Sequence, residues 1–247
     1  MRTLGVILAR SGSVGLANKH MLPLLGRPVI EYTFDHARSS LRLTDLVVSS
    51  DCPLIRRAAA GAGIHTIARP AELATADASV QAVLLHAMRT VEAARNVRFD
   101  AIVTLYGNVP LRGDGVIDRA LEALESSGCD SVRTFTPVGK WHPAWMSRLN
   151  DGNVEALHRG SIHRRQDLEP LFLHDGAVVA VTRASMLLGE SNPDDPHAFF
   201  GMNRRGIQTP MGETIEIDHL RDLYWAEATL RERQAVEEAH TTRRIAS

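Results

Sequence analysis

The feature that most constrains the fold is an alternation of short strand-like segments with segments of helical periodicity. Residues 4–9 form a nearly continuous apolar run, and residues 46–50 and 100–105 are two further strand-like segments. Runs of this kind are typical of strands buried on both faces of a parallel sheet. Helices are predicted at residues 29–39, 51–62, about 79–94 and about 115–126, with a short strand at 64–67. This order predicts an α/β fold with a Rossmann-like, mainly parallel sheet.

The alternation changes after residue 130. Residues 131–135 predict another strand, residues 141–145 are rich in tryptophan and proline, and residues 150–153 are Asn-Asp-Gly-Asn, a turn signal between two hairpin strands. We interpret residues 138–172 as an arm inserted into a single domain that spans residues 1–247. Later strands are predicted at 177–182 and 214–218, and a helix at 220–239. Trp141 and Trp145 are expected to pack in a core; the alternative is that they line an interface or a sugar pocket.

Charge and cysteine content exclude several classes of partner and site. Lys and Arg total 28 against 29 for Asp and Glu, so no net field draws the chain to nucleic acid or to an anionic membrane. Cys52 and Cys129 lack the spacing of a zinc site or a disulfide framework. No apolar run reaches the roughly 18 residues of a transmembrane helix. We expect a cytoplasmic protein without nucleic-acid or membrane partners.

A glycine-containing loop follows the first predicted strand. It comprises Arg10, Ser11, Gly12, Ser13, Val14 and Gly15, and Lys19 lies shortly after it. Glycines at the end of a buried strand let backbone N–H groups approach a phosphate, and two flanking cations supply the charge that an anion needs. The spacing matches neither a P-loop nor a dinucleotide-binding fingerprint. The alternative is a flexible surface turn.

A pair of carboxylates, Glu216 and Asp218, lies in the predicted strand at residues 214–218. Side chains two apart in a strand project from one face, about 7 Å apart. One or two carboxylates, completed by water and substrate phosphates, are typical of a magnesium site. The alternative is a solvated strand face.

Three further groups of residues are candidates for binding. Residues 164–167 combine two arginines with an amide, which suits a carboxylate or phosphate, although a surface charge cluster is an equal alternative. Residues 106–112 follow a parallel strand at its carboxyl end, where ligands bind in open α/β sheets; the alternative is a structural proline turn. His20, His142 and His174 are expected to be surface or hydrogen-bonded residues.

Taken in order, these segments resemble the acylneuraminate cytidylyltransferase family, whose members include the CMP-sialic acid synthetases. The resemblance covers almost the whole chain and rests on residues 7–15 with Lys19, and on residues 47–51, 69–74, 110–112, 165–167, 175–177 and 215–218. It departs from the usual family sequence at Val14, His20, residues 106–109 and Glu216.

The resemblance implies an enzyme that transfers CMP from CTP to the anomeric hydroxyl of a nonulosonic 2-keto sugar acid, with magnesium as cofactor. It implies a nucleotidyltransferase-type fold that dimerises through the inserted arm. The implied catalytic residues are Arg10, Lys19 and Asp218, with Glu216 and Asp218 on the metal. The implied nucleotide-binding residues are Arg10, Ser11, Gly12, Ser13, Gly15, Lys19, Ser79 and Asn108, and the implied sugar-acid ligands are Arg165, Gln166 and Asp175. Transfer to another sugar or from another base, or a catalytically degenerate binding protein, are the alternatives.

Overall fold

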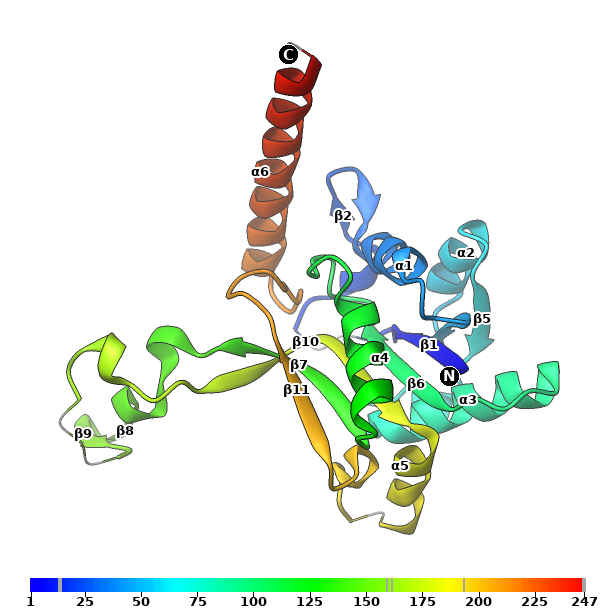
Figure 1. Ribbon diagram of the computed structural model, residues 1–247, viewed down its shortest axis with the longest axis horizontal. Helices are drawn as coiled ribbons and strands as arrows, with labels where there is room; N and C mark the ends of the chain where they lie inside the picture. The colour runs from blue at the N-terminus through cyan, green and yellow to red at the C-terminus, as the bar shows by residue number, and fades with distance from the viewer. Residues whose placement is uncertain (13–14, 159, 161, 193, 246–247) are drawn as a thin grey trace.

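The computed structural model describes residues 1–12, 15–158, 160, 162–192 and 194–245. Its central sheet has strands β1 (Thr3–Leu8), β4 (Asp45–Ser50), β5 (His65–Ala68), β6 (Ala101–Tyr106), β7 (Ser131–Pro137), β10 (Phe172–Thr182) and β11 (Arg204–Gln208). The order across the 7-stranded sheet is β11-β7-β10-β6-β1-β4-β5. Strand β10 runs antiparallel to both of its neighbours, and the other neighbouring pairs are parallel. The predicted mainly parallel α/β sheet is confirmed (Figure 1).

Helices cover both faces of the sheet. The helices are α1 (Val29–Ser39), α2 (Pro53–Gly61), α3 (Val80–Arg95), α4 (Val116–Ser127), α5 (Arg183–Leu188) and α6 (Leu220–Ile245). Apolar side chains of α1, α2 and α4 form one core with β1, β4 and β6, and those of α3 and α5 form a second core on the opposite face. Ser79 begins α3 as its N-cap, because its hydroxyl accepts from Ala82 N–H at 3.1 Å. Among the described residues, none of the helices has both the length and the apolar character that crossing a bilayer requires.

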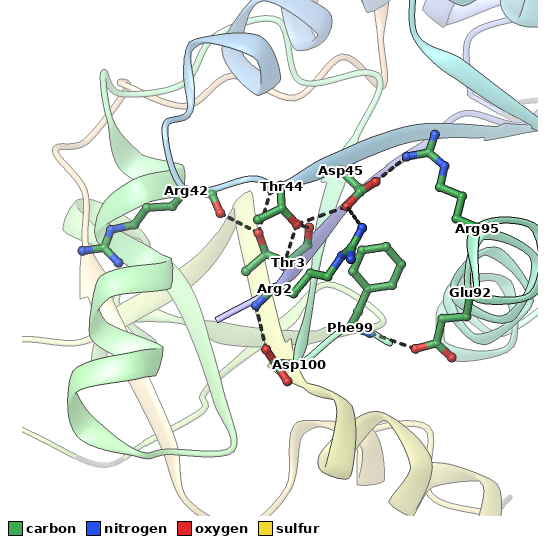
Figure 2. A network of polar contacts seen from close by, with 9 residues as sticks. All are labelled: Arg2, Thr3, Arg42, Thr44, Asp45, Glu92, Arg95, Phe99 and Asp100. Atoms are coloured by element: carbon green, nitrogen blue, oxygen red, sulfur yellow. Dashed lines mark hydrogen bonds and ion pairs between the residues drawn. The ribbon is translucent and has the colours of Figure 1, made fainter. Parts of the chain in front are cut away.

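A polar network closes the amino ends of the central strands (Figure 2). Thr3 N–H donates to Thr44 Oγ1 at 3.0 Å, and the Thr44 hydroxyl donates to Thr3 O at 2.7 Å. The nearly buried carboxylate of Asp45 pairs with Arg2 at 3.4 Å and with Arg95 from α3. These contacts tie β1 to β4 and to the helix layer at this edge of the sheet. The carboxyl ends of the parallel strands lie on the opposite side of the sheet, which is where open α/β sheets bind ligands.

The segment between β7 and β10 projects away from the sheet (Figure 1). It carries the hairpin strands β8 (Ser147–Asn150) and β9 (Asn153–Ala156), joined through Asp151 and Gly152 at φ 48° and 81°. Positive φ at both positions is what a tight hairpin turn requires, so the predicted turn is confirmed. The expected core packing of the tryptophans is wrong, because Trp141 is 69% exposed and Trp145 38%. Both belong to this projecting segment, none of whose described residues is part of the three apolar cores.

The predicted strand at residues 214–218 is not a regular strand. Its pairing is an isolated bridge between Ile215 and Leu111. The alternation of its side chains is nevertheless as expected, since Ile215 and Ile217 are buried while Glu216 and Asp218 are exposed. The two isoleucines pack with Leu111 and with the first turns of α6 in a third small core. This anchoring fixes the segment although it lacks a continuous hydrogen-bonded ladder.

Candidate active site

A cavity of about 410 Å³ opens at the carboxyl ends of the parallel strands. Each of four strands ends next to a polar residue at this edge: Arg10 follows β1, Asp51 follows β4, Arg69 follows β5 and Asn108 follows β6. The fold therefore brings together residues far apart in sequence, as expected for ligand binding in an open α/β sheet. The polar residues that line the cavity are Arg10, Lys19, His20, Arg69, Thr75, Tyr106, Asn108, Glu216 and Asp218.

The glycine loop is held by a carboxylate from the neighbouring strand. Asp51 accepts hydrogen bonds from Ser11 N–H at 2.8 Å and from the Ser11 hydroxyl. Burial opposes the charge of Asp51, but these bonds outweigh it and lower the pKa of the carboxyl. Gly12 has φ 66°, which favours glycine. Ser11 thus shapes the loop, while Ser13 and Val14 lie outside the described residues.

Lys19 and Asp218 form an ion pair at the cavity. Lys19 Nζ lies 2.6 Å from Asp218 Oδ1, and the two side chains are 16% and 51% exposed. Gly15 lies against the same segment, because a Cβ there would lie 2.8 Å from Asp218 O. A side chain at position 15 would push the glycine loop away from the carboxylate. The glycine therefore allows the loop and the carboxylate segment to touch.

Asn108 joins the two carboxylates. Its Nδ2 donates to Glu216 Oε1 at 3.0 Å and to Ile217 O at 3.1 Å, and lies 3.5 Å from Asp218 Oδ1. Ile217 N–H in turn donates to Asn108 O at 2.8 Å. The family resemblance implied that Asn108 contacts the nucleotide; in the structure its amide lies between the two carboxylates. Its side chain therefore orients the pair toward the cavity.

His20 and Arg69 are cavity residues that the sequence analysis did not assign to the site. His20 is 4% exposed rather than a surface residue; burial and the charges of Lys19, Arg69 and Arg10 lower its pKa to about 3, against the opposing charge of Asp51. Arg69 donates to Ser49 Oγ at 3.2 Å and to Ser49 O at 2.7 Å. The place of Arg69 after a parallel strand was the sequence signal that could have identified it.

Arg112 shapes the loop that follows β6. Its fully buried guanidinium donates to Ala177 O at 2.8 Å, Thr33 Oγ1 at 3.0 Å, Val109 O at 2.5 Å and Tyr106 O at 2.8 Å. Burial lowers its pKa to about 9, although the charges of nearby carboxylates act in the opposite direction. The guanidinium thus fixes the backbone on both sides of Asn108.

Tyr106 lies at the same cavity, at the end of β6. Burial raises the pKa of its phenol, the negative charge of Glu216 raises it further, and Arg133 acts in the opposite direction. The phenol is therefore neutral at physiological pH and lies within the electrostatic influence of Glu216.

Six described residues assigned to the site from the sequence do not line this cavity. Ser11 and Gly12 belong to the glycine loop described above, and the other four lie elsewhere. Ser79 caps α3 and lines a separate cavity with Gln81 and Arg89. Arg165 and Gln166 are exposed on a short helical turn, η5 (Arg165–Asp167), within the projecting segment. Asp175 is half-buried, and its oxygens are bonded to donors of the protein itself.

The carboxylate pair fits a small hard cation that keeps substrate and water ligands. The oxygens of Glu216 and Asp218 converge on one amide nitrogen, so the two side chains share one side of the cavity. Among the described residues, no cluster of three or more His, Cys, Asp or Glu side chains is arranged to hold a metal. The described residues therefore do not supply a complete set of metal ligands. A pair of carboxylates is nevertheless enough for magnesium, which takes its other ligands from water and substrate phosphates.

The sequence profile of a family described as cytidylyltransferase matches residues 4–186. The chain belongs to the cytidylyltransferase family. The match spans all four parallel strands around the cavity and continues through β10 into α5. The residues of this cytidylyltransferase-family chain that hold the carboxylate pair, 216–218, lie beyond the matched region.

Curated relatives point to the same family. An N-acylneuraminate cytidylyltransferase of Streptococcus agalactiae is 34% identical over 77% of this chain and 46% of its own length. The chain therefore spans about half the length of that relative. A pseudaminic acid cytidylyltransferase of Campylobacter jejuni is 29% identical, over 92% of this chain and 95% of its own.

Solved structures share the fold of this cytidylyltransferase-family chain. A CMP:2-keto-3-deoxy-manno-octonic acid synthetase complexed with CTP has a TM-score of 0.72 at 18% identity, covering 94% of this chain and 100% of its own. A 4-diphosphocytidyl-2C-methyl-D-erythritol synthase from Anaerococcus prevotii has a TM-score of 0.61 at 15% identity, covering 93% and 98%. At these identities the likeness establishes the fold.

Proposed function

We propose that the chain transfers CMP from CTP to the anomeric hydroxyl of a nonulosonic 2-keto sugar acid and releases pyrophosphate. The observation that carries this proposal is the convergence of the cationic glycine loop and the Glu216/Asp218 pair on one cavity, in a chain of the cytidylyltransferase family. Curated relatives named for acylneuraminate, octulosonate and pseudaminic acid support a sugar acid as acceptor.

The cations around the cavity account for how the chain would hold a triphosphate. Arg10 and Lys19 flank the glycine loop, and Arg69 lines the cavity from the end of β5. In-line attack of the acceptor oxygen on the α-phosphorus forms one P–O bond as the bond to pyrophosphate breaks. Catalysis then comes mainly from orientation and from neutralising the phosphate charge, and covalent chemistry by the enzyme is unnecessary.

We propose Glu216 and Asp218 as the residues that would hold magnesium. When bound, the cation would neutralise phosphate charge and orient the phosphates for displacement. Asn108 would keep both carboxylates directed to one side, and Lys19 would exchange its contact with Asp218 for one with phosphate.

We propose that the active form is a cytoplasmic homodimer. Arg165 and Gln166 are exposed on the projecting segment and do not line their own chain's cavity. The arm of a second copy could bring them to a sugar acid. Sedimentation velocity of the wild-type protein tests the dimer directly.

Pyrophosphate release tests the reaction. Purified protein is incubated with magnesium, each of CTP, UTP, ATP and GTP, and a panel of nonulosonic and octulosonic acids, with Asp218→Asn as the matched inactive control. We expect release only with CTP and a nonulosonic acid. Equal rates with all four nucleotides would overturn the cytidylyl assignment, and a preference for octulosonic acids would change the acceptor.

A further inference from the structure

Asp175 occupies an irregular part of β10, between residues that pair regularly with β7. Its Oδ1 accepts from the Thr134 hydroxyl at 2.5 Å and from Ala177 N–H at 3.0 Å. Its Oδ2 accepts from the Thr209 hydroxyl at 2.6 Å and the Thr214 hydroxyl at 3.0 Å. An ionised carboxylate offers about four lone-pair sites, so its capacity is used within the protein.

Two of these donors, Thr209 and Thr214, lie at the two ends of the segment that leads to Glu216. Thr209 follows β11 directly, and Thr214 lies two residues before Glu216. Thr209 is fully buried, and its N–H donates to Phe135 O at 2.8 Å. A single carboxylate therefore holds both ends of residues 209–214, the stretch of chain that leads from the sheet to Glu216.

The backbone beside Asp175 also contacts the site. A Cβ added at Gly176 would lie 3.5 Å from Glu216 Oε2, and Gly176 has φ 75°. The next carbonyl, Ala177 O, accepts from the guanidinium of Arg112. The turn that contains Asp175 is thus packed between the Glu216 carboxylate and the loop that carries Asn108.

The charge state of Asp175 suits this arrangement. Burial alone would raise its pKa, but the hydrogen bonds from Thr134, Thr209, Ala177 N–H and Thr214 together lower it. The group is therefore an anion at neutral pH whose donors all come from the protein. An acceptor sugar would have to displace one of them in order to bind to it.

We propose that Asp175 is a positioning residue: it holds residues 209–214 against β7 and β10 and thereby fixes where the Glu216 carboxylate stands for a divalent cation. This replaces the sugar-binding role expected from the sequence. The inference rests on the proposed function, in which Glu216 and Asp218 bind the metal.

The test removes one hydroxyl without changing side-chain size. Thr214→Val loses the bond to Asp175 Oδ2, Thr214→Ser retains it, and Asp175→Asn removes the charge. Binding of Mn²⁺ to the protein alone is measured from the EPR signal of the free ion, and the magnesium midpoint and sugar-acid KM are measured by pyrophosphate release. Asp35→Asn, at an exposed aspartate of α1 paired with Arg27 at 2.7 Å, is the distant control.

We expect Thr214→Val and Asp175→Asn to weaken Mn²⁺ binding about fivefold or more and to raise the magnesium midpoint, with sugar-acid KM unchanged. Thr214→Ser and Asp35→Asn should match the wild type. An increase in sugar-acid KM with unchanged metal binding would restore the substrate-binding role, and unchanged Mn²⁺ binding in Thr214→Val would overturn the inference. A wild type that neither binds metal nor releases pyrophosphate would instead overturn the proposed function.

Discussion

Lys19 and Asp218 are 199 residues apart in sequence, yet Lys19 Nζ lies 2.6 Å from Asp218 Oδ1 at the mouth of the cavity. The pair joins the loop that we assign to phosphate with the segment that we assign to magnesium. Both partners retain contact with solvent, and ion pairs of this kind contribute about 0–1 kcal/mol to stability. The pair therefore matters for the site far more than for the fold.

Asp218→Asn should nearly abolish pyrophosphate release while leaving the fold intact. The substitution keeps the size of the side chain but removes the charge that holds a cation and faces Lys19. Activity is measured at saturating magnesium, and thermal unfolding is followed without ligand. A variant with near-normal turnover would show that the metal is held elsewhere.

Glu216→Gln should raise the magnesium concentration needed for half-maximal activity, with a smaller loss of maximal rate than Asp218→Asn. An amide in place of Glu216 can still contact a cation through one oxygen, and the hydrogen bond from Asn108 survives. A magnesium titration of initial rates measures the effect. Identical titrations for variant and wild type would make Glu216 a solvated surface residue.

Arg165→Ala should reduce kcat/KM for the sugar acid at least tenfold, with CTP binding unchanged by calorimetry. A charge-assisted hydrogen bond to a carboxylate contributes about 1.5–3 kcal/mol, which corresponds to such a loss. Arg164→Ala is the matched control, because its guanidinium is engaged by Asp167 at 2.8 Å. Weakened CTP binding with an unchanged sugar KM would contradict the assignment.

The stability of the protein should fall as the pH drops below about 6.5, partly because of His20. Burial and the neighbouring cations lower the pKa of His20 to about 3, from 6.5, and burial together with Arg112 lowers that of His36 to about 4. Above pH 6.5 both histidines are neutral in the folded and in the unfolded protein. Below pH 6.5 they are protonated in the unfolded chain but still neutral in the folded protein, so the free energy of unfolding falls by about 1.4 kcal/mol per pH unit for each histidine.

Denaturant unfolding between pH 7 and 4 measures this dependence. His20→Asn should give a shallower decline of the unfolding free energy, by about one proton, while His36 continues to contribute. Parallel curves for variant and wild type would mean that His20 is not buried as a neutral group.

Arg112→Lys should lower the free energy of unfolding by at least about 2 kcal/mol, because a buried ammonium cannot reach acceptors that the planar guanidinium reaches together. Val109 O and Tyr106 O would lose the guanidinium and keep only longer contacts, from the Thr33 hydroxyl at 3.1 and 3.3 Å and, for Tyr106 O, from Val109 N–H at 3.2 Å. Arg119→Lys, at an exposed arginine with a bond to Asp114 O, is the control and should change little. A small loss for Arg112→Lys would show that the loop after β6 is held by its apolar contacts.

Sequence patterns predicted those parts of the fold in which local pattern and burial agree. The helix expected at residues 29–39 occurs at those residues, and buried strands occur at the apolar runs. Strand β11 was missed because Arg204 and Arg205 give it no apolar signature: it is an exposed edge strand held by pairing with β7. The expected strand at residues 214–218 fails because only Ile215 finds a bridge partner.

Two kinds of local pattern predicted residues of the site. Lys19 flanks the glycine loop, and Asp218 belongs to a segment in which polar and apolar side chains alternate. The hydrogen bonds of Asn108 and Asp175 depend on segments brought together from distant parts of the chain, so no local pattern reveals them. The burial of His20 was not predicted, because it involves packing against a distant segment: a Cβ at Gly107 would lie 3.1 Å from the His20 ring.

The projecting segment leaves and rejoins the sheet at adjacent positions, since Pro137 at the end of β7 pairs with Phe172 at the start of β10. A hairpin turn of two to five residues is of ordinary length for such a junction. A short turn could therefore replace the insertion, or another insertion could take its place, without a change in the pairing register of β7 and β10. A chain built this way can change the part that reaches outward without changes in the sheet that carries the cavity.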